Sequence, residues 1–278
     1  MIRVVDDAGR ALALPHAARR IVSLVPSLTE TVFALGGGES VVGVTRYCTE
    51  PAAAVAHIAR VGGTKNPDID RIVALRPDLV IVNAEENRRE DFAALEVAGL
   101  MVFVSFPRRA RDVALLLHRL GALSATEPAA AAMVSELERT LALMDATAPP
   151  HRARIFCPIW KNPWMSFNRD TYDDDMLWIA GAENVCRDRE ARYPSVTLAD
   201  IAAAQPEVIL LPDEPYVFQE KDLPALAALR DTPAWRERRV HFVDGKALSW
   251  YGARTAAALG VLRRIIAALR DPHPGPPP

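Results

Sequence analysis

The stretch that decides the fold is Ile72-Val73-Ala74-Leu75-Arg76-Pro77-Asp78-Leu79-Val80-Ile81-Val82. It predicts a short helix, a proline that stops the helix, an acidic residue, and a strand apolar enough to be buried on both faces. The same order of features recurs in the second half of the chain as Ile201-Ala202-Ala203-Ala204-Gln205-Pro206-Glu207-Val208-Ile209-Leu210-Leu211. This recurrence predicts two similar α/β lobes.

A second pair of segments also matches between the two halves. Ser27-x-x-Glu30 is followed by Leu35-Gly36, and Thr171-x-x-Asp174 is followed by Ala180-Gly181. Both have capping-box spacing, so we expect helices to start at Ser27 and Thr171 and to end at the glycines. The triplet at residues 36–38 follows a helix, so it indicates a helix stop and not a phosphate-binding loop. Because the two matches have different offsets, we interpret them as a duplicated topology with different insertions.

Strands and helices are predicted to alternate along the chain. Apolar, strand-length runs are found at Ile21–Val25, Val41–Val44, Leu79–Val82, Met101–Ser105, Ile155–Ile159, Val208–Leu211 and Val240–Val243. Helical patterns are found at Asp70–Leu75, Arg89–Ala98, Asp112–Leu120, Asp173–Ala180, Leu198–Ala204 and Ala253–Leu269. The alternation predicts an α/β fold with parallel-type sheets flanked by helices.

A long helix is predicted between the two halves, over Thr126–Met144, because Ala, Leu, Glu and Met are strong helix formers. A helix of about 20 residues is about 30 Å long, which suits a strut joining two lobes. We therefore predict an N-terminal lobe at 1–125, a linking backbone helix at 126–148, a C-terminal lobe at 149–270 and a disordered tail at 271–278. An ordinary crossover helix within one domain is the alternative. One apolar stripe runs along the helix at Met133, Leu137, Leu141 and Met144.

Composition excludes several classes of function. The formal net charge is −2, with 33 basic and 35 acidic residues, so a nucleic-acid partner is not expected. The three cysteines form no CxxC motif, and we expect free thiols. No apolar run reaches the length that spans a bilayer. The first seven residues contain no apolar signal-peptide core, so the chain as written is not addressed to the exterior.

Motifs typical of enzymes are missing from the sequence. There is no GxSxG nucleophile elbow, no GxxxxGK[ST] phosphate loop and no HExxH zinc helix. The six histidines include no i,i+4 pair that would suit a metal. We therefore expect no catalytic residue, no metal site and no covalently bound cofactor, and we predict that the protein is not an enzyme.

Aromatic residues point to a ligand site. All five tryptophans lie in the second half, and the loop Pro158–Asn168, which follows a predicted strand, contains Trp160, Lys161 and Trp164. In open α/β sheets, ligands bind beyond the carboxyl ends of the strands. An aromatic loop there suits a large flat ligand in a cleft between the lobes. The alternative is that Trp164 and Phe167 fill the core of their own lobe.

Other predicted strand ends carry candidate ligand contacts as well. Asn83 ends one strand, and Ser249–Arg254 precedes the last predicted helix. We expect aromatic stacking on the ligand, with Lys161, Asn83 or Arg254 meeting its amide or carboxylate edges. A solvated loop is the alternative interpretation for Glu86 and Asp213.

At these residues the chain resembles a known family. The segments Arg20–Glu30, Val42–Tyr47 and Ile72–Val80 are similar to the periplasmic binding proteins with a helical backbone (class III), which serve ABC importers of vitamin B12, haem and ferric siderophores. The resemblance covers residues 3–269 and looks nearest to the cobalamin-binding branch. It implies two α/β lobes joined by one long helix. Further matching segments are Asp6–Arg10, Leu14-Pro15, Gly181–Val185 and Asp244-Gly245.

The resemblance also implies roles for particular positions. Tyr47 matches a tyrosine that lines the corrinoid cleft, Tyr193 matches a cleft tryptophan, and Thr64 stands where the vitamin B12 receptor has another cleft tryptophan. Trp250 and Tyr251 fall in a loop that contacts the ligand.

Docking on the permease is implied by the same resemblance, because family receptors use one acidic residue per lobe. Asp70 matches the first, and the second position is Ala199, with Asp200 beside it. We therefore expect Asp70 and Asp200 to contact the permease.

The resulting functional hypothesis is a monomeric solute-binding protein of an ABC importer, periplasmic or on the cell surface, that holds a cobalamin-like corrinoid or a ferric chelate such as a siderophore or haem. One alternative is a cytoplasmic corrinoid or haem carrier or sensor, which would suit Met1 as the native start. Another is a tetrapyrrole-modifying enzyme on the same fold.

Overall fold

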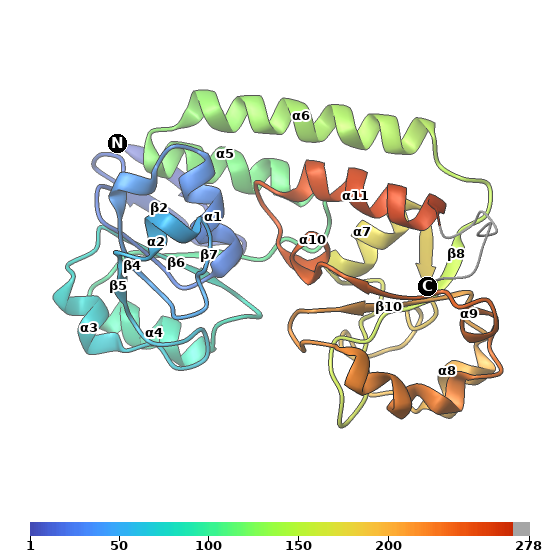
Figure 1. Cartoon of the computed structure of the whole chain (residues 1–278). Helices are drawn as coiled ribbons and strands as arrows, with labels where there is room; N and C mark the ends of the chain where they lie inside the picture. The colour runs from blue at the N-terminus through green and yellow to red at the C-terminus, as the bar shows by residue number, and fades with distance from the viewer. Residues whose placement is uncertain (269–278) are drawn as a thin grey trace. The chain divides into compact units, whose positions relative to one another are not determined.

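The computed structural model describes residues 1–268, and Figure 1 traces the order of its elements. Two compact units share the chain. Unit 1 comprises residues 1–107, 111–138 and 251–254, and unit 2 comprises residues 108–110 and 139–250 together with the chain from Thr255 on. The predicted lobe boundaries do not separate the short segments 108–110 and 251–254, each of which belongs to the unit other than the one that surrounds it. The boundaries stay a prediction. The predicted tail at 271–278 lies outside the described residues.

Unit 1 is built on a parallel five-stranded sheet with the order β5-β4-β3-β6-β7. Its strands are β3 (Ile21–Ser23), β4 (Val41–Val44), β5 (Ala59–Arg60), β6 (Leu79–Asn83) and β7 (Val102–Ser105). The helical segments are α1 (Pro26–Ala34), η1 (Gly38–Ser40), α2 (Ala52–Val55), α3 (Ile69–Ala74), α4 (Arg89–Val97) and α5 (Asp112–Ser124).

Both faces of this sheet are buried. On one face, Val80 and Val82 pack with Ile72 of α3 and Leu95 of α4. The alternate strand residues are fully buried too, including Ile81. Burial on both faces explains why these strands appear in the sequence as continuous apolar runs.

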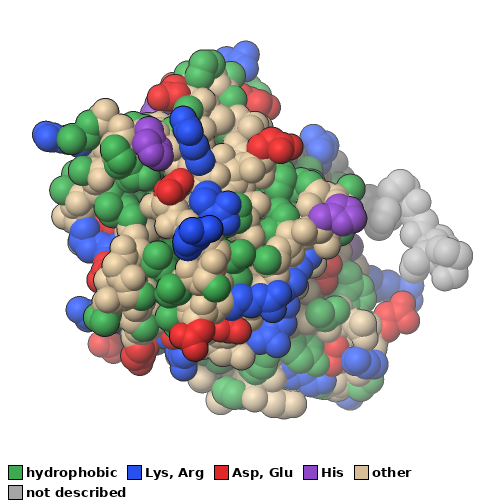
Figure 2. Space-filling view, turned by 90° about the vertical axis from the view of Figure 1, so that its left-hand side faces the viewer, with side chains coloured by type: hydrophobic (Ala, Val, Ile, Leu, Met, Phe, Trp, Pro, Cys, Tyr) green, Lys and Arg blue, Asp and Glu red, His purple; other side chains and the backbone are tan. Residues whose placement is uncertain are grey.

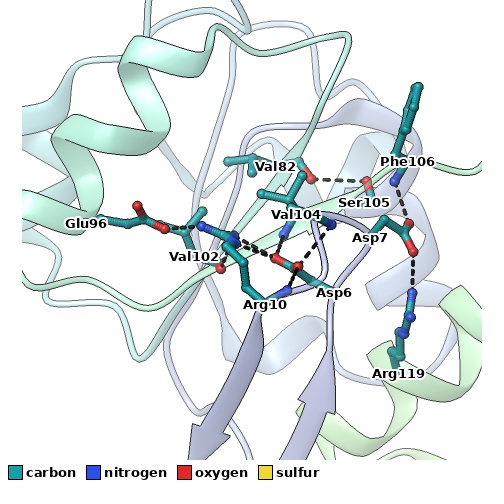
Figure 3. A network of polar contacts seen from close by, with 11 residues as sticks. Asp6, Asp7, Arg10, Val82, Glu96, Val102, Val104, Ser105, Phe106 and Arg119 are labelled. Carbon is teal, nitrogen blue, oxygen red and sulfur yellow. Dashed lines mark hydrogen bonds and ion pairs between the residues drawn. The ribbon is translucent and has the colours of Figure 1, made fainter.

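An N-terminal hairpin covers the free edge of β7, and its turn is drawn in Figure 3. The hairpin consists of β1 (Ile2–Val5) and β2 (Ala11–Leu14), which pair antiparallel. The buried Asp6 carboxylate accepts hydrogen bonds from the Arg10 guanidinium, at 2.6 Å, and from the Val104 backbone N–H, at 3.2 Å. Asp7 donates its N–H to the Val104 carbonyl at 3.0 Å and pairs with Arg119. These contacts occupy backbone groups that an edge strand otherwise leaves open.

Unit 2 has a parallel four-stranded sheet with the order β11-β10-β8-β9. Phe156, Ile209 and Leu211 from this sheet form a buried core with Ile201 and Leu226 from the covering helical segments. The strands are β8 (Ala153–Phe156), β9 (Ala182–Asn184), β10 (Val208–Pro212) and β11 (Val240–Val243). The helical segments are α7 (Tyr172–Ala180), α8 (Leu198–Ala203), η2 (Glu220–Leu229), α9 (Pro233–Arg236), α10 (Gly245–Ser249) and α11 (Thr255–Ala268).

The two units repeat one topology, because β4-β3-β6-β7 and β9-β8-β10-β11 have the same strand order. The acidic residue that follows each proline also accepts an equivalent backbone hydrogen bond in both units. Asp78 accepts a hydrogen bond from the Arg20 N–H at 3.0 Å, and Glu207 accepts one from the Arg154 N–H at 2.8 Å. Each of these arginines donates its guanidinium to the carbonyl group that follows α3 or α8. The predicted α/β fold with two similar parallel sheets is confirmed.

The long helix is α6 (Glu127–Ala146), a single helix of 20 residues. Its residues through Glu138 belong to unit 1, and those from Arg139 on belong to unit 2. The buried stripe consists of Ala130, Val134, Leu137, Leu141 and Met144.

The two capping boxes had different outcomes. Thr171 caps α7 as predicted, since its hydroxyl accepts from the Asp174 N–H at 3.3 Å. The box at Ser27 is wrong, because α1 begins one residue earlier, at Pro26, and its N-cap residue Val25 makes no side-chain cap. Proline supplies the fixed φ that starts this helix instead.

The surface carries mixed side chains. Figure 2 shows basic, acidic and hydrophobic groups intermixed on one face, as expected for a solvated surface. Among residues 1–268, no helix is both long and apolar enough to cross a membrane.

Candidate ligand-binding site

Most candidate ligand residues lie at or just beyond the carboxyl end of a parallel strand of their own unit. In unit 1, Tyr47 follows β4, Thr64 follows β5 and Asn83 ends β6. In unit 2, Trp160 follows β8 and Tyr193 follows β9. Parallel strands share one carboxyl edge, so each unit gathers its candidates at one edge of its sheet.

Asn87 joins two of these loops in unit 1. Its buried amide oxygen accepts from the Asn83 N–H at 2.8 Å, and its amide nitrogen donates to the Thr64 carbonyl at 2.9 Å. Asn83 is 3% exposed, and its side-chain oxygen accepts from the N–H groups of Glu85 and Glu86. The side chain of Asn83 therefore shapes the loop, and its contact with the edge of a ligand stays a prediction.

Tyr47 is the accessible aromatic residue of this edge, with 54% of its surface exposed. The Arg46 guanidinium lies 5.6 Å from the centre of its ring, and the same side chain donates to the Asn66 amide oxygen at 3.0 Å. These contacts link the Tyr47 loop to the Thr64 loop. Tyr47 therefore offers a free ring surface beside a cation.

The segment Tyr251–Arg254 belongs to unit 1, although the residues on both sides belong to unit 2. Tyr251 donates its hydroxyl to Glu86 at 3.2 Å, and Arg254 pairs with Glu30 at 2.5 Å. Tyr251 is only 7% exposed, and burial raises the pKa of its hydroxyl well above its usual range. Both side chains thus hold the segment in place, and a ligand contact by either stays a prediction.

In unit 2, backbone bridges bring the Trp160 and Tyr193 loops together. Met165 pairs antiparallel with both Trp160 and Ser195. Trp160 is 44% exposed. Trp164 stacks on Phe218 at 5.9 Å and packs against the core, and Phe167 is fully buried. The loop therefore presents Trp160 to solvent and Phe167 to the core, and the partly buried Trp164 packs against that core. Whether Trp164 also meets a ligand stays a prediction.

Two candidates of unit 2 are tied to acidic partners. Lys161 donates to Asp222 at 2.7 Å, and the hydrogen bond with Asp222 raises the pKa of this lysine. Trp250 is 7% exposed, and its indole N–H donates to Glu214 at 2.7 Å. The surrounding protein therefore already covers most of the Trp250 ring. Whether Lys161 or Trp250 meets a ligand stays a prediction.

The two predicted docking acids lie on equivalent helices. Asp70 is exposed in the first turn of α3, and Asp200 is exposed in the first turn of α8. Asp200 is 3.6 Å from Arg189, a contact between half-exposed side chains that contributes little. Their role in docking stays a prediction.

Sequence reasoning missed residues that organise the site. Asn87 and Asp222 are buried polar side chains that each bond two or more loop groups, and Tyr216 contacts Trp160. Asn87 and Tyr216 each lie four residues after the end of a strand, β6 and β10 respectively. Asp222 carries no such signal, since it lies in η2 as part of a capping box with Gln219.

Cysteine thiols and clusters of metal-binding side chains are the remaining groups that could react with or hold a ligand. Cys48, Cys157 and Cys186 are buried free thiols, as expected, and burial raises the pKa of each. Within the described part of the chain, no three His, Cys, Asp or Glu side chains are grouped so as to hold a metal ion.

The family is decided by a model described as periplasmic binding protein, which matches residues 21–247. The chain belongs to this family. This match confirms the family-level resemblance that we found in the sequence. The description of the family names its members as periplasmic proteins.

Individual relatives agree with this membership. A vitamin B12-binding protein of Yersinia pestis is 29% identical over 204 residues, which are 72% of each chain. The structure of the periplasmic vitamin B12-binding protein of Vibrio cholerae has a TM-score of 0.80 at 23% identity and covers 92% of this chain and 99% of its own. The periplasmic haem-binding protein of Roseiflexus sp. RS-1, in its apo form, also has a TM-score of 0.80, at 26% identity, and covers 91% and 99%.

Proposed function

We propose that this periplasmic binding protein is the receptor of an ABC importer and that its ligand is a cobalamin-like corrinoid or an iron chelate such as haem. The observation that carries the proposal is the pair of exposed aromatic side chains at the carboxyl edges of the two sheets, Tyr47 in unit 1 and Trp160 in unit 2. Both rings lie on loops beyond the carboxyl ends of parallel strands, where open α/β sheets bind their ligands, and this position favours a ligand surface.

The chemistry of these loops suits a tetrapyrrole. A corrinoid or haem has a broad apolar face, on which an indole or phenol ring stacks with a large contact area and little loss of conformational entropy. Its rim carries amides or carboxylates, and Arg46 lies beside Tyr47 to meet such groups. Relatives named for vitamin B12 and for haem support the same ligand class.

The proposed site binds and does not catalyse. The relatives are named as binding proteins, and the loops described above supply aromatic surface and hydrogen-bond donors. We infer that the protein acts as a periplasmic monomer and delivers its ligand to the permease through Asp70 and Asp200. Both acids are exposed on equivalent helices, which supports one contact per unit.

The ligand class is tested with cyanocobalamin, hemin and a ferric hydroxamate as probes. Native mass spectrometry and absorbance titration should give a saturable complex with at least one of them, and the probe should be recovered chemically unchanged. A folded protein that binds none of the three contradicts the proposed function. Recovery of a modified probe would point to an enzyme instead.

Docking is tested separately with Asp70→Ala. We expect this variant to bind the probe like the wild type but to lose stimulation of the permease ATPase in membranes that contain the importer. Glu39→Ala, which removes an exposed acidic residue of η1 in the same unit, is the matched control and should leave stimulation intact. Equal stimulation by Asp70→Ala and the wild type would remove Asp70 from the docking surface.

A further inference from the structure

Four aromatic side chains of unit 2 form a row from the surface into the core. Trp160, 44% exposed, meets Tyr216 edge-on, with 5.7 Å between ring centres and 77° between ring planes. Tyr216 contacts Phe218 at 4.6 Å, and Phe218 stacks on Trp164 at 5.9 Å. Phe218 is 3% exposed, so the row is anchored in the core at this ring. The orientation of the exposed indole therefore depends on what holds Tyr216.

One buried carboxylate holds both residues that flank this exposed ring. Asp222 has a side chain that is 2% exposed, and it accepts hydrogen bonds from Lys161 Nζ at 2.7 Å and from the Tyr216 hydroxyl at 3.1 Å. It also accepts from the Gln219 N–H at 2.9 Å, which fixes the carboxylate to the start of η2. Lys161 adjoins Trp160 in the chain, and Tyr216 packs against the Trp160 ring. Asp222 thus joins the β8 loop to the β10 loop.

The charges agree with this arrangement. The hydrogen bond from Lys161 is the main reason that the pKa of Asp222 lies below its usual range, so the carboxylate is ionised at neutral pH. An ionised carboxylate accepts several hydrogen bonds at once, and bonds to a charged partner are the stronger kind. The ammonium of Lys161 therefore faces a carboxylate of the protein itself.

We propose that Asp222 is a positioning residue for ligand binding, which fixes Trp160 and Tyr216 as a rigid two-ring corner that receives the flat face and the rim of a tetrapyrrole. The inference rests on the proposed function. A corner that is already ordered loses less conformational entropy when the ligand arrives, so it binds more tightly than the same rings on mobile loops. On this assignment Lys161 acts through Asp222 and does not pair with the ligand.

Asp222→Asn tests the proposal because it keeps the size of the side chain and removes the charge that holds Lys161. We expect hemin or cyanocobalamin, whichever binds the wild type, to bind about tenfold more weakly, as is common when a hydrogen bond to a charged group is lost. The matched control is Glu207→Gln, which alters a carboxylate of the same unit that bonds backbone at the opposite edge of the sheet. It should lower the melting temperature without changing affinity.

A double-mutant cycle with Trp160→Ala separates positioning from general stability. If Asp222 acts through the corner that Trp160 shares with Tyr216, Asp222→Asn costs less affinity in the Trp160→Ala background than in the wild type, because contacting residues couple in this way and independent ones add. An equal loss in both backgrounds, or wild-type affinity for Asp222→Asn, overturns the proposal. If Asp222→Asn does not fold, Tyr216→Phe, which removes only the hydroxyl bonded to Asp222, takes its place in the same cycle. A wild type that binds neither hemin nor cyanocobalamin ends this inference, and the proposed function fails as well only if the ferric hydroxamate does not bind either.

Discussion

Trp160→Ala should weaken ligand binding and leave folding nearly unchanged. A tryptophan buries about 250 Å² when it is fully covered. With 44% of Trp160 exposed, about 110 Å² is left for a ligand to cover. At about 25 cal/mol per Å², full coverage would contribute about 2.7 kcal/mol. Allowing for incomplete coverage, we expect a loss of about 2 kcal/mol, which is about a thirtyfold rise in Kd.

The assay is titration calorimetry with cyanocobalamin or hemin, alongside a thermal melt of each variant. Phe242→Ala is the matched control, because Phe242 is an aromatic residue of the same unit with 45% exposure that we do not assign to the ligand. The control should bind like the wild type. Normal ligand affinity in Trp160→Ala, or an equal loss in Phe242→Ala, would refute the assignment of Trp160 to the ligand.

Three further predictions concern stability. Trp250→Ala should lower the free energy of unfolding by about 3 kcal/mol, because it removes a buried ring; a urea titration that shows less than about 1 kcal/mol would contradict its burial. Burial raises the pKa of Glu214, so the native state keeps that proton to higher pH than the unfolded chain. Ionised Glu214 therefore opposes folding above its folded pKa, and the cost disappears as the pH falls below the unfolded value. Glu214→Gln should have a higher Tm than the wild type at neutral pH and the same Tm at about pH 4. A lower Tm for the variant at neutral pH would contradict an unfavourable contribution of ionised Glu214 to folding. Asp6→Ala should lower the free energy of unfolding by about 2 kcal/mol, since it leaves the Val104 N–H without its carboxylate acceptor, whereas Glu96→Ala, at a half-exposed ion pair, should change the Tm little.

The fold could be predicted from the sequence where local patterns and packing agree. The repeated helix, proline, acid and strand were recognisable because both sheets are buried on both faces, and burial imposes continuous apolar runs. The hairpin β1–β2 was missed because its strands lack burial on both faces: β1 alternates half-buried with exposed positions, and β2 alternates buried with exposed ones. What fixes this hairpin is Asp6 reaching Val104, a contact that no local pattern reports.

The candidate site could be predicted only in part. Trp160 was selected because its loop follows a predicted strand, whereas Tyr47 was selected only through the resemblance to the family; both rings are exposed in the structure. The burial of Trp250 was not predicted. In the sequence, an aromatic residue of a polar loop looks the same whether it faces solvent or a partner such as Glu214. Asp222 was missed for a related reason, since its partner Lys161 lies far away in the chain and comes near it only in the folded unit.

The most direct test is a crystal structure of the protein grown with the tetrapyrrole that it binds. We expect the ring system to lie against the indole of Trp160, within van der Waals distance of about 4 Å, with Tyr216 beside its rim. A tetrapyrrole bound elsewhere, with Trp160 still open to solvent, would contradict the assignment of these strand-end loops to the ligand.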